Sequence, residues 1–238
     1  MSMFSNLKTE ENVAEETDSI PVGRGPLESG LYPMTIDMAY ADESKGGAMN
    51  VNFVFKDADG RELRQTIYVS SGDAKGKLPY YVDKDGNKKY LPGFNKVNHI
   101  CLLTVGKELM EMDTDEKVLS LWDSEQRKEV PQKKQVLMDL LGQDIILGVQ
   151  KQIEDKVSKN DQGAWVPTGE TRETNEIDKV FRAKDKKTVA EIKAEVEEAQ
   201  FINDWEEKWT GVTRDRTKKN SNTPKPAAEK KTTSSMFG

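Results

Sequence analysis

The strongest constraint on the fold is an alternation of apolar and other residues that repeats three times between residues 31 and 69. Successive side chains of a β-strand point to opposite faces of a sheet, so this alternation marks strands with one buried face. The predicted strands cover residues 31–41, 49–55 and 63–69, and turn-forming residues separate them. In the first strand the alternating apolar residues are Tyr32, Met34, Ile36, Met38 and Tyr40. We therefore predict an antiparallel meander.

The segments that follow predict a barrel. Residues 71–93 are rich in Gly, Lys and Tyr and predict a projecting hairpin. A short buried helix is predicted by apolar spacing at Val97, Ile100, Cys101, Thr104 and Val105. Further strands are expected at 118–122, 136–140, 145–153, around Trp165 and at 177–181. Three strands, a helix and more strands is the order of an oligonucleotide-binding (OB) barrel, so we predict a mainly β, OB-like Greek-key barrel with an inserted short helix.

A C-terminal amphipathic helix is predicted within residues 184–211, packed on the barrel. Thr188 and Glu191 form the capping-box pattern that starts helices. Apolar residues then recur at steps of three and four, giving one stripe: Val189, Ile192, Val196, Ala199, Ile202, Trp205 and Trp209. We expect Trp205 and Trp209 to dock this helix, with acidic residues on its other face.

Composition predicts a modest core with flexible ends, because hydrophobic residues are 35% and charged residues 33% of the chain. We expect an acidic flexible leader at 1–26, a binding domain at 27–183 and a disordered basic tail at 212–238. Met236 and Phe237 near the end of that tail are a candidate adhesive motif. The single cysteine excludes an intramolecular disulfide, and no apolar run is long enough to cross a bilayer, so a soluble protein of a reducing cytosol is expected.

The net charge of −6 conceals a basic centre. Residues 45–107 carry eleven Lys and Arg against six Asp and Glu, an excess of +5. Screening limits the reach of charges to about 8–10 Å, so a basic surface can bind phosphates on an acidic protein.

No catalytic constellation is found, and we expect neither an enzyme nor a cofactor or metal. His99 and Cys101 are interpreted as packing residues, since a Cys/His mechanism requires the base to reach the thiol. The Asp57–Gly60 and Asp83–Gly86 segments lack the remaining ligands of a calcium loop and predict hairpin turns.

The positive signal is aromatic and basic. All six tyrosines lie between residues 32 and 94, and Tyr68 is out of phase with the core face of its strand, sharing the outer face with Arg64 and Thr66. Unpaired bases stack on such rings while nearby cations follow the phosphates. The other candidate nucleic-acid-binding residues are Lys45, Lys75, Lys77, Tyr80, Tyr81, Lys88, Lys89, Tyr90 and Trp165. The alternative is that these tyrosines brace a hairpin that the lysines solvate, and that Trp165 packs in the core.

Several short segments resemble the single-stranded DNA-binding proteins encoded by tailed bacteriophages. They are Pro26–Tyr32, Ala39–Ala41, Ser44–Ala48, Tyr80-Tyr81, Leu91–Phe94, Thr174–Ile177 and Trp205–Trp209. The resemblance covers residues 26–209 and implies an OB-type barrel that coats single-stranded DNA during phage replication, recombination and repair, in the cytoplasm of the host bacterium. Many members carry an acidic recruiting tail, whereas this tail is basic.

Two alternatives remain beside this reading. The protein could be a recombination mediator or annealing protein, or a protein-interaction module of phage or host replication or transcription machinery that uses the acidic helix face. The expected partners are single-stranded DNA and phage or host replication, recombination or transcription proteins, with no membrane. The sequence specifies neither an oligomeric state nor a preference for DNA over RNA.

Overall fold

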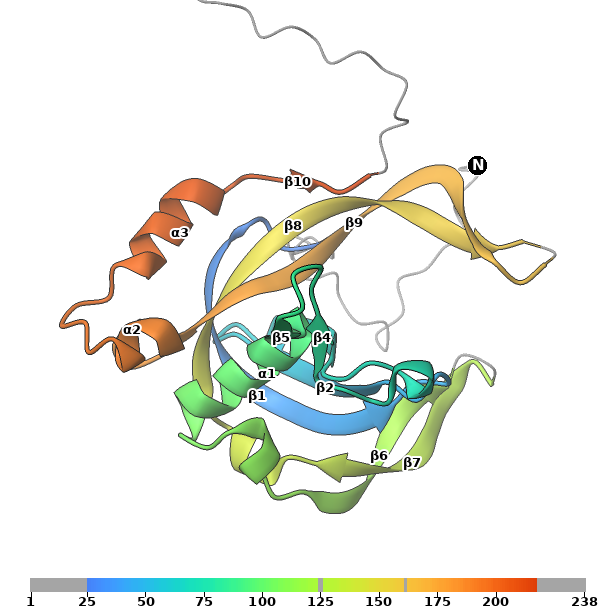
Figure 1. Cartoon of the computed structure of the whole chain (residues 1–238), viewed down its shortest axis with the longest axis horizontal. Helices are drawn as coiled ribbons and strands as arrows, with labels where there is room; N and C mark the ends of the chain where they lie inside the picture. Colours follow the sequence, from blue (N-terminus) through green and yellow to red (C-terminus); the bar gives the residue numbers. More distant parts are fainter. Residues whose placement is uncertain (1–24, 124–125, 161, 218–238) are drawn as a thin grey trace, which may run out of the picture.

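The predicted meander lies at the centre of one sheet in the computed structural model, which describes residues 25–123, 126–160 and 162–217 (Figure 1). Its strands are β1 (Gly30–Glu43), β2 (Met49–Lys56) and β3 (Glu62–Tyr68), paired antiparallel. The odd-numbered apolar residues of β2 and β3 are buried, as the alternation predicts: Val51, Phe53, Phe55, Leu63 and Ile67. The architecture is mainly β, with an antiparallel sheet and few helices.

The alternation predicted for β1 is correct only for its first half. Met34 and Ile36 are buried, but a β-bulge between Ile36 and Met38 adds a residue and reverses the phase. Ala39 is therefore the next buried residue, and Tyr40 points to the outer face of the sheet. The prediction that Met38 and Tyr40 continue the core face is wrong for this reason.

Strand β1 is shared by several partners. Its first half pairs with β8 (Asp144–Lys159), and its second half pairs with β2 and briefly with β7 (Lys128–Val136). Strand β9 (Trp165–Arg182) pairs with β8 on the opposite edge. The two strands predicted around Trp165 and at 177–181 are thus one long strand, because β8 extends far enough to pair with all of it.

The sheet leaves a gap between β3 and β9. Within the described residues no backbone ladder joins these strands, and no closed barrel is detected. The predicted helix α1 (Pro92–Thr104) lies across the gap and contacts both strands. Its buried residues are Phe94, Val97, Ile100, Cys101 and Leu103. Gln65 of β3 also reaches β9, donating to Glu176 at 3.1 Å and accepting from the Ile177 amide at 3.3 Å.

The hairpins include the predicted projection, formed by β4 (Tyr80–Val82) and β5 (Lys88–Tyr90). A second hairpin is formed by β6 (Asp115–Asp123) and β7. The strand predicted at 136–140 is wrong. Val136 ends β7, and Met138–Leu140 form a 3-10 turn (η3) that redirects the chain into β8 while burying Leu140. Two further 3-10 turns are present. In the chain, η1 (Asp73–Lys75) follows β3 and η2 (Leu109–Glu111) follows α1.

The prediction of a single C-terminal helix is also wrong, because the structure has two helices in this region. These are α2 (Val189–Lys193) and α3 (Phe201–Trp209). The predicted capping box at Thr188 is confirmed, but the other oxygen of Glu191 accepts from the amides of Gln200 and Phe201, at 2.8 and 2.9 Å. Glu191 therefore links the end of one helix to the start of the next, a tertiary contact that overrides the local periodicity.

Helix α3 docks through Trp205, as predicted. Trp205 and Ile202 are buried against Ile146 and Phe181 on the outer side of β8 and β9. The indole of Trp205 donates to Asp178 at 2.8 Å. Gly148 leaves the space for this ring, because a Cβ there would lie 3.0 Å from it. Trp209 is half-buried at the edge of the same cluster.

The ordered part of the chain extends further than predicted at the C-terminal end. At the N-terminal end of the described residues, the backbone of Leu27 and the side chain of Asn175 exchange two hydrogen bonds. Residues 212–217, predicted to be disordered, are instead held by the sheet. Ser29 donates to the Val212 carbonyl at 2.6 Å, and β10 (Arg214–Asp215) pairs parallel to β8 where β1 no longer covers it.

The rest of both predicted flexible ends, including Met236 and Phe237, lies outside the described residues. Among the residues that are described, no helix is long and apolar enough to cross a membrane.

Replacing Glu191 with Gln should lower stability in a pH-dependent way. Burial raises the pKa of Glu191, but hydrogen bonds from the amides of Thr188, Phe201 and Gln200 outweigh it and hold the pKa below its ordinary value of 4.5. A carboxylate with a depressed pKa stabilises the fold above its ordinary pKa, and this contribution is lost as pH falls through the folded-state value. The wild type should exceed Glu191→Gln by about 1–3 kcal/mol in free energy of unfolding at neutral pH.

Urea unfolding at neutral pH and at about pH 3 measures this difference, which should shrink at the acidic pH. Glu197→Gln is the control, because Glu197 is exposed in the segment between the helices. A difference that does not change with pH would contradict the role assigned to the ionised carboxylate.

Candidate nucleic-acid interface

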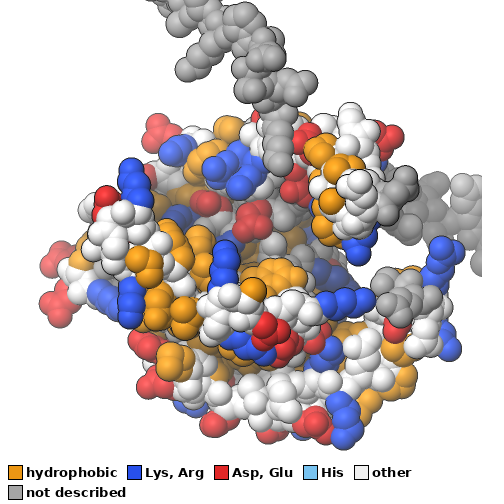
Figure 2. Space-filling view, turned by 45° about the vertical axis from the view of Figure 1, so that its right-hand side comes forward, with side chains coloured by type: hydrophobic (Ala, Val, Ile, Leu, Met, Phe, Trp, Pro, Cys, Tyr) orange, Lys and Arg blue, Asp and Glu red, His pale blue; other side chains and the backbone are white. Residues whose placement is uncertain are grey.

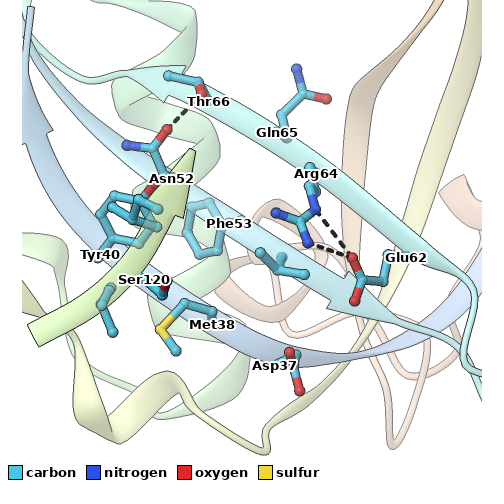
Figure 3. Close-up of a pocket in the computed structure, with 13 residues that line it drawn as sticks. Asp37, Met38, Tyr40, Asn52, Phe53, Glu62, Arg64, Gln65, Thr66 and Ser120 are labelled. Atoms are coloured by element: carbon cyan, nitrogen blue, oxygen red, sulfur yellow. Dashed lines mark hydrogen bonds and ion pairs between the residues drawn. The ribbon is translucent and has the colours of Figure 1, made fainter. Parts of the chain in front are cut away.

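The outer face of β1, β2 and β3 carries a groove of about 460 Å³ (Figure 3). Its floor consists of outward residues from the three strands: Met38, Tyr40, Asn52, Val54, Arg64 and Thr66. Leu119 and Leu121 of β6 form a wall beside it. The hairpin β6–β7 therefore turns a flat sheet face into a groove with an apolar side and a polar floor.

The polar groups of this floor are tied to one another. Thr66 donates to Asn52 at 2.6 Å, and Asn52 in turn donates to Asn50 at 2.8 Å. Arg64 is 72% exposed and binds Glu62 through two nitrogens, at 2.8 and 3.1 Å. A phosphate that approaches Arg64 would therefore share its guanidinium with Glu62.

Tyr68 lies on the outer face, as its phase predicts. Its side chain is 51% exposed at the end of β3. It borders a second hollow of about 480 Å³, together with Lys75 and the start of α1 at Leu91, Pro92 and Gly93. The ring thus has free surface for stacking, with a cation in the same hollow.

The tyrosines of the β4–β5 hairpin divide between its two faces. Tyr80 and Tyr90 are paired across the hairpin and share a face, whereas Tyr81 is on the other face and is exposed. Lys88 lies 4.9 Å from the centre of the Tyr80 ring, and Tyr90 stacks on Phe94 at 4.8 Å. The bracing role considered for these tyrosines holds for Tyr90, which keeps one ring face exposed.

The candidate lysines differ in how far their charge is compensated. Lys77 pairs with Glu43 at 2.9 Å and Asp73 at 3.4 Å, and Lys89 pairs with Asp83 at 2.8 Å. In the described part of the chain, Lys75 and Lys88 have no carboxylate partner within 4 Å. Lys45 is exposed in the turn between β1 and β2.

Two hairpin arms extend from the same side of the sheet, and each carries an exposed tryptophan. Trp165 is 64% exposed on the β8–β9 arm, so it does not pack in the core, and Lys159 lies 5.4 Å from its ring centre. Trp122 on the β6–β7 arm is 66% exposed. Figure 2 shows the molecule hollowed between these arms, with Lys and Arg side chains on the rim.

Sequence reasoning missed Tyr40 and Trp122 as site residues. The bulge in β1 that exposes Tyr40 has no local sequence signal. Trp122, however, directly precedes a polar stretch beginning at Asp123, and the same criterion singled out Trp165 next to its turn. Applying that criterion throughout the chain would have found Trp122.

Of the residues considered for catalysis, Cys101 packs in the core as predicted, whereas His99 is half-buried and lines a hollow between α1 and β9. Cys101 is fully buried, and burial raises the pKa of its thiol to about 12. Burial, with contributions from Lys179 and Lys193, lowers the pKa of His99. Asp57 and Asp83 each accept two backbone amides within their hairpin turns. Among the described residues there is no group of three or more His, Cys, Asp or Glu that could hold a metal ion.

No family model matches the chain, and no curated protein is found that is related to it.

Gly93→Ala should disturb the position of Tyr68. Helix α1 begins so close to the end of β3 that a Cβ on Gly93 would lie 2.0 Å from the carbonyl oxygen of Tyr68. Backbone cannot move aside as a flexible side chain can, so we expect a loss of about 1–3 kcal/mol in free energy of unfolding. Chemical denaturation measures it, with Gly25→Ala as control because a Cβ there meets no atom within 4 Å. Equal stability of the two variants would show that α1 can shift freely.

Proposed function

We propose that this protein binds single-stranded DNA along the outer face of β1, β2 and β3, with little sequence selectivity. The observation that carries the proposal is the half-exposed ring of Tyr68, which shares a strand face with Arg64 and Thr66 and a hollow with Lys75. Base stacking on one such ring is worth about 1–3 kcal/mol, and every base offers a ring face.

The strand order supports an OB-like barrel as the scaffold. The long strands follow the order β9, β8, β1, β2, β3, and α1 comes after the third strand in the chain. This is the arrangement of a partly open five-stranded Greek-key barrel, in which the face of the second and third strands binds oligonucleotides. The gap between β3 and β9 is the open seam of such a barrel, filled here by α1 and by Gln65.

The surroundings of the face suit a flexible single strand better than a duplex. The hairpins carry the exposed aromatic residues Tyr81, Trp122 and Trp165, which offer further stacking surfaces. Single bases can reach rings distributed in this way, whereas a duplex keeps its bases stacked on each other. In this proposal the protein coats and protects single-stranded DNA during phage replication, recombination and repair in the bacterial cytoplasm, and an annealing role would use the same face.

A second candidate function, binding of a partner protein, is favoured by one specific observation. An apolar groove of about 560 Å³ lies between β2, β7 and η2, and three methionines line it: Met49, Met110 and Met112. Met110 is 81% exposed, and methionine side chains adapt to varied apolar partners. An apolar segment of a replication, recombination or transcription protein would fit this groove.

A salt titration with a labelled oligothymidylate tests the proposed function. Binding should weaken linearly in log K against log salt, because each neutralised phosphate releases condensed cations, and a duplex of equal length should bind less tightly. Affinity that does not depend on salt, or that is equal for duplex, would reject single-stranded DNA binding and favour the protein-partner function.

Tyr68→Ala should weaken oligonucleotide binding by about 1–3 kcal/mol with little change in melting temperature, because an exposed ring contributes stacking but little core area. Tyr68→Phe keeps the ring and should retain binding, so it is the matched control. Fluorescence titration and thermal unfolding of both variants measure the two effects. A large fall in the melting temperature of Tyr68→Ala, with binding retained by the folded fraction, would assign the ring to the core instead.

A further inference from the structure

A third hollow, of about 600 Å³, lies between α1, β9, α2, α3 and β10. We call it the α1–β10 groove. Its lining includes four cations and two aromatic rings: Lys96, Lys179, Arg214, Arg216, Tyr90 and Phe201. Lys96 and Lys179 were not candidates from the sequence, whereas Arg214 and Arg216 belong to the segment 212–238 predicted as a basic tail.

Three of these cations are not compensated by direct ion pairs. Lys96 pairs with Glu176, but Lys179, Arg214 and Arg216 have no carboxylate within 4 Å in the part of the chain that the structure describes. The ammonium of Lys179 lies 5.8 Å from the centre of the Phe201 ring. Arg214 donates to Gln150 at 3.2 Å. These contacts hold the cations in place without neutralising them.

Acidic side chains also line the groove, and each accepts hydrogen bonds there. Asp178 accepts the indole N–H of Trp205 at 2.8 Å, and Glu191 accepts the amides that join α2 to α3. Glu176 also lines the groove and pairs with Lys96, so four cations stand against three carboxylates, an excess of one positive charge. The pKa of His99, which lies in the same lining, reflects it, since burial lowers that pKa and Lys179 and Lys193 lower it further.

Strand β10 brings two of the cations to the groove. Arg214 lies in β10 and Arg216 follows the strand directly, and both residues line the groove. The pairing of Arg214 with Gln152 and of Asp215 with Ile153 fixes the position of β10, and Gln152 itself lines the groove.

The α1–β10 groove adjoins the hollow at Tyr68. Pro92, at the start of α1, lines both this groove and the hollow that contains Tyr68. Tyr90 lies beside Pro92 on the groove side, with one ring face against Phe94. A strand leaving Tyr68 therefore meets an exposed ring and then the uncompensated cations.

We propose that the α1–β10 groove binds the phosphates of a second segment of the same single-stranded DNA, so that the strand leaves the sheet face at Tyr68, passes Tyr90 and ends on Lys179, Arg214 and Arg216. The inference rests on the proposed function and extends its site from one face of the sheet to two connected surfaces. It predicts that a short oligonucleotide uses the sheet face alone, and that a longer one gains affinity and salt dependence from the groove.

The test compares the double variant Lys179→Gln/Arg216→Gln with the wild type on oligothymidylates of about 8 and about 16 nucleotides, within the range of site sizes of OB folds. Both side chains are exposed, and neither makes a hydrogen bond with another described residue, so the melting temperature should not change. With the longer oligonucleotide the salt slope should fall by about 1.4, which is about 0.7 for each lost phosphate contact. With the shorter one, slope and affinity should stay within about twofold of the wild type.

The control is Lys107→Gln/Lys184→Gln, which removes the same charge from positions that line none of the hollows described above. Three outcomes would each contradict DNA binding in the groove while leaving binding on the sheet face intact. They are an equal effect of the control, an equal effect on both oligonucleotide lengths, and an unchanged salt slope with the longer oligonucleotide. If the wild type binds neither length, the proposed function itself fails.

Discussion

The fold depends on how the sheet is bridged between β3 and β9. Burying a side chain such as Val, Leu, Ile or Phe contributes about 1.5–3 kcal/mol, whereas a net hydrogen bond contributes about 0.5–1.5 kcal/mol. Helix α1 buries Phe94, Val97, Ile100 and Leu103 across the gap, so it supplies most of the free energy of closure. The contacts of Gln65 and Lys96 with β9 contribute less, but they fix which residues of the two strands face each other.

The same bridge determines where a ligand can bind. Because α1 starts against the end of β3, the hollow at Tyr68 and the α1–β10 groove share Pro92. The cations are unevenly compensated across these surfaces: Arg64, Lys77 and Lys89 have carboxylate partners, whereas Lys179, Arg214 and Arg216 do not within the described residues. Since screening confines each charge to about 8–10 Å, this local arrangement matters more than the net charge of the protein.

Features set by neighbouring residues could be predicted from the sequence, whereas features set by distant contacts could not. The phase of Tyr68 follows from the residues of its own strand, and the turns at Asp57 and Asp83 follow from side chains that bind backbone amides two and four residues ahead. The position of Tyr40 depends on a bulge without a glycine to mark it. The break between α2 and α3 depends on Glu191 reaching amides nine and ten residues away.

The α1–β10 groove is a further case, because Lys96, Lys179 and Arg216 line one hollow only when α1, β9 and the segment around β10 are assembled. The sequence showed that residues 45–107 and the segment 212–238 are basic, but it did not show that Arg214 and Arg216 meet Lys179 in one groove. The sequence gives the number of cations, whereas the proposed site depends on which of these cations lack a carboxylate partner.

The sharing of β1 has a consequence for how the chain folds during its synthesis. Strands β2 and β3 follow β1 directly, but the strand that covers the other edge of β1, β8, is made much later, and the contact between Leu27 and Asn175 joins residues 148 positions apart. Such non-local pairing is slow to form, and an open strand edge invites pairing with another chain. Pro33 lies in the half of β1 that waits for β8. Ile36 donates to Gln143 and accepts from Gly142, so the even-numbered residues of this half bond toward β8 and Pro33 faces the other edge, beyond the end of β2. Its missing N–H therefore removes a donor from the stretch of β1 that β2 leaves open to another chain.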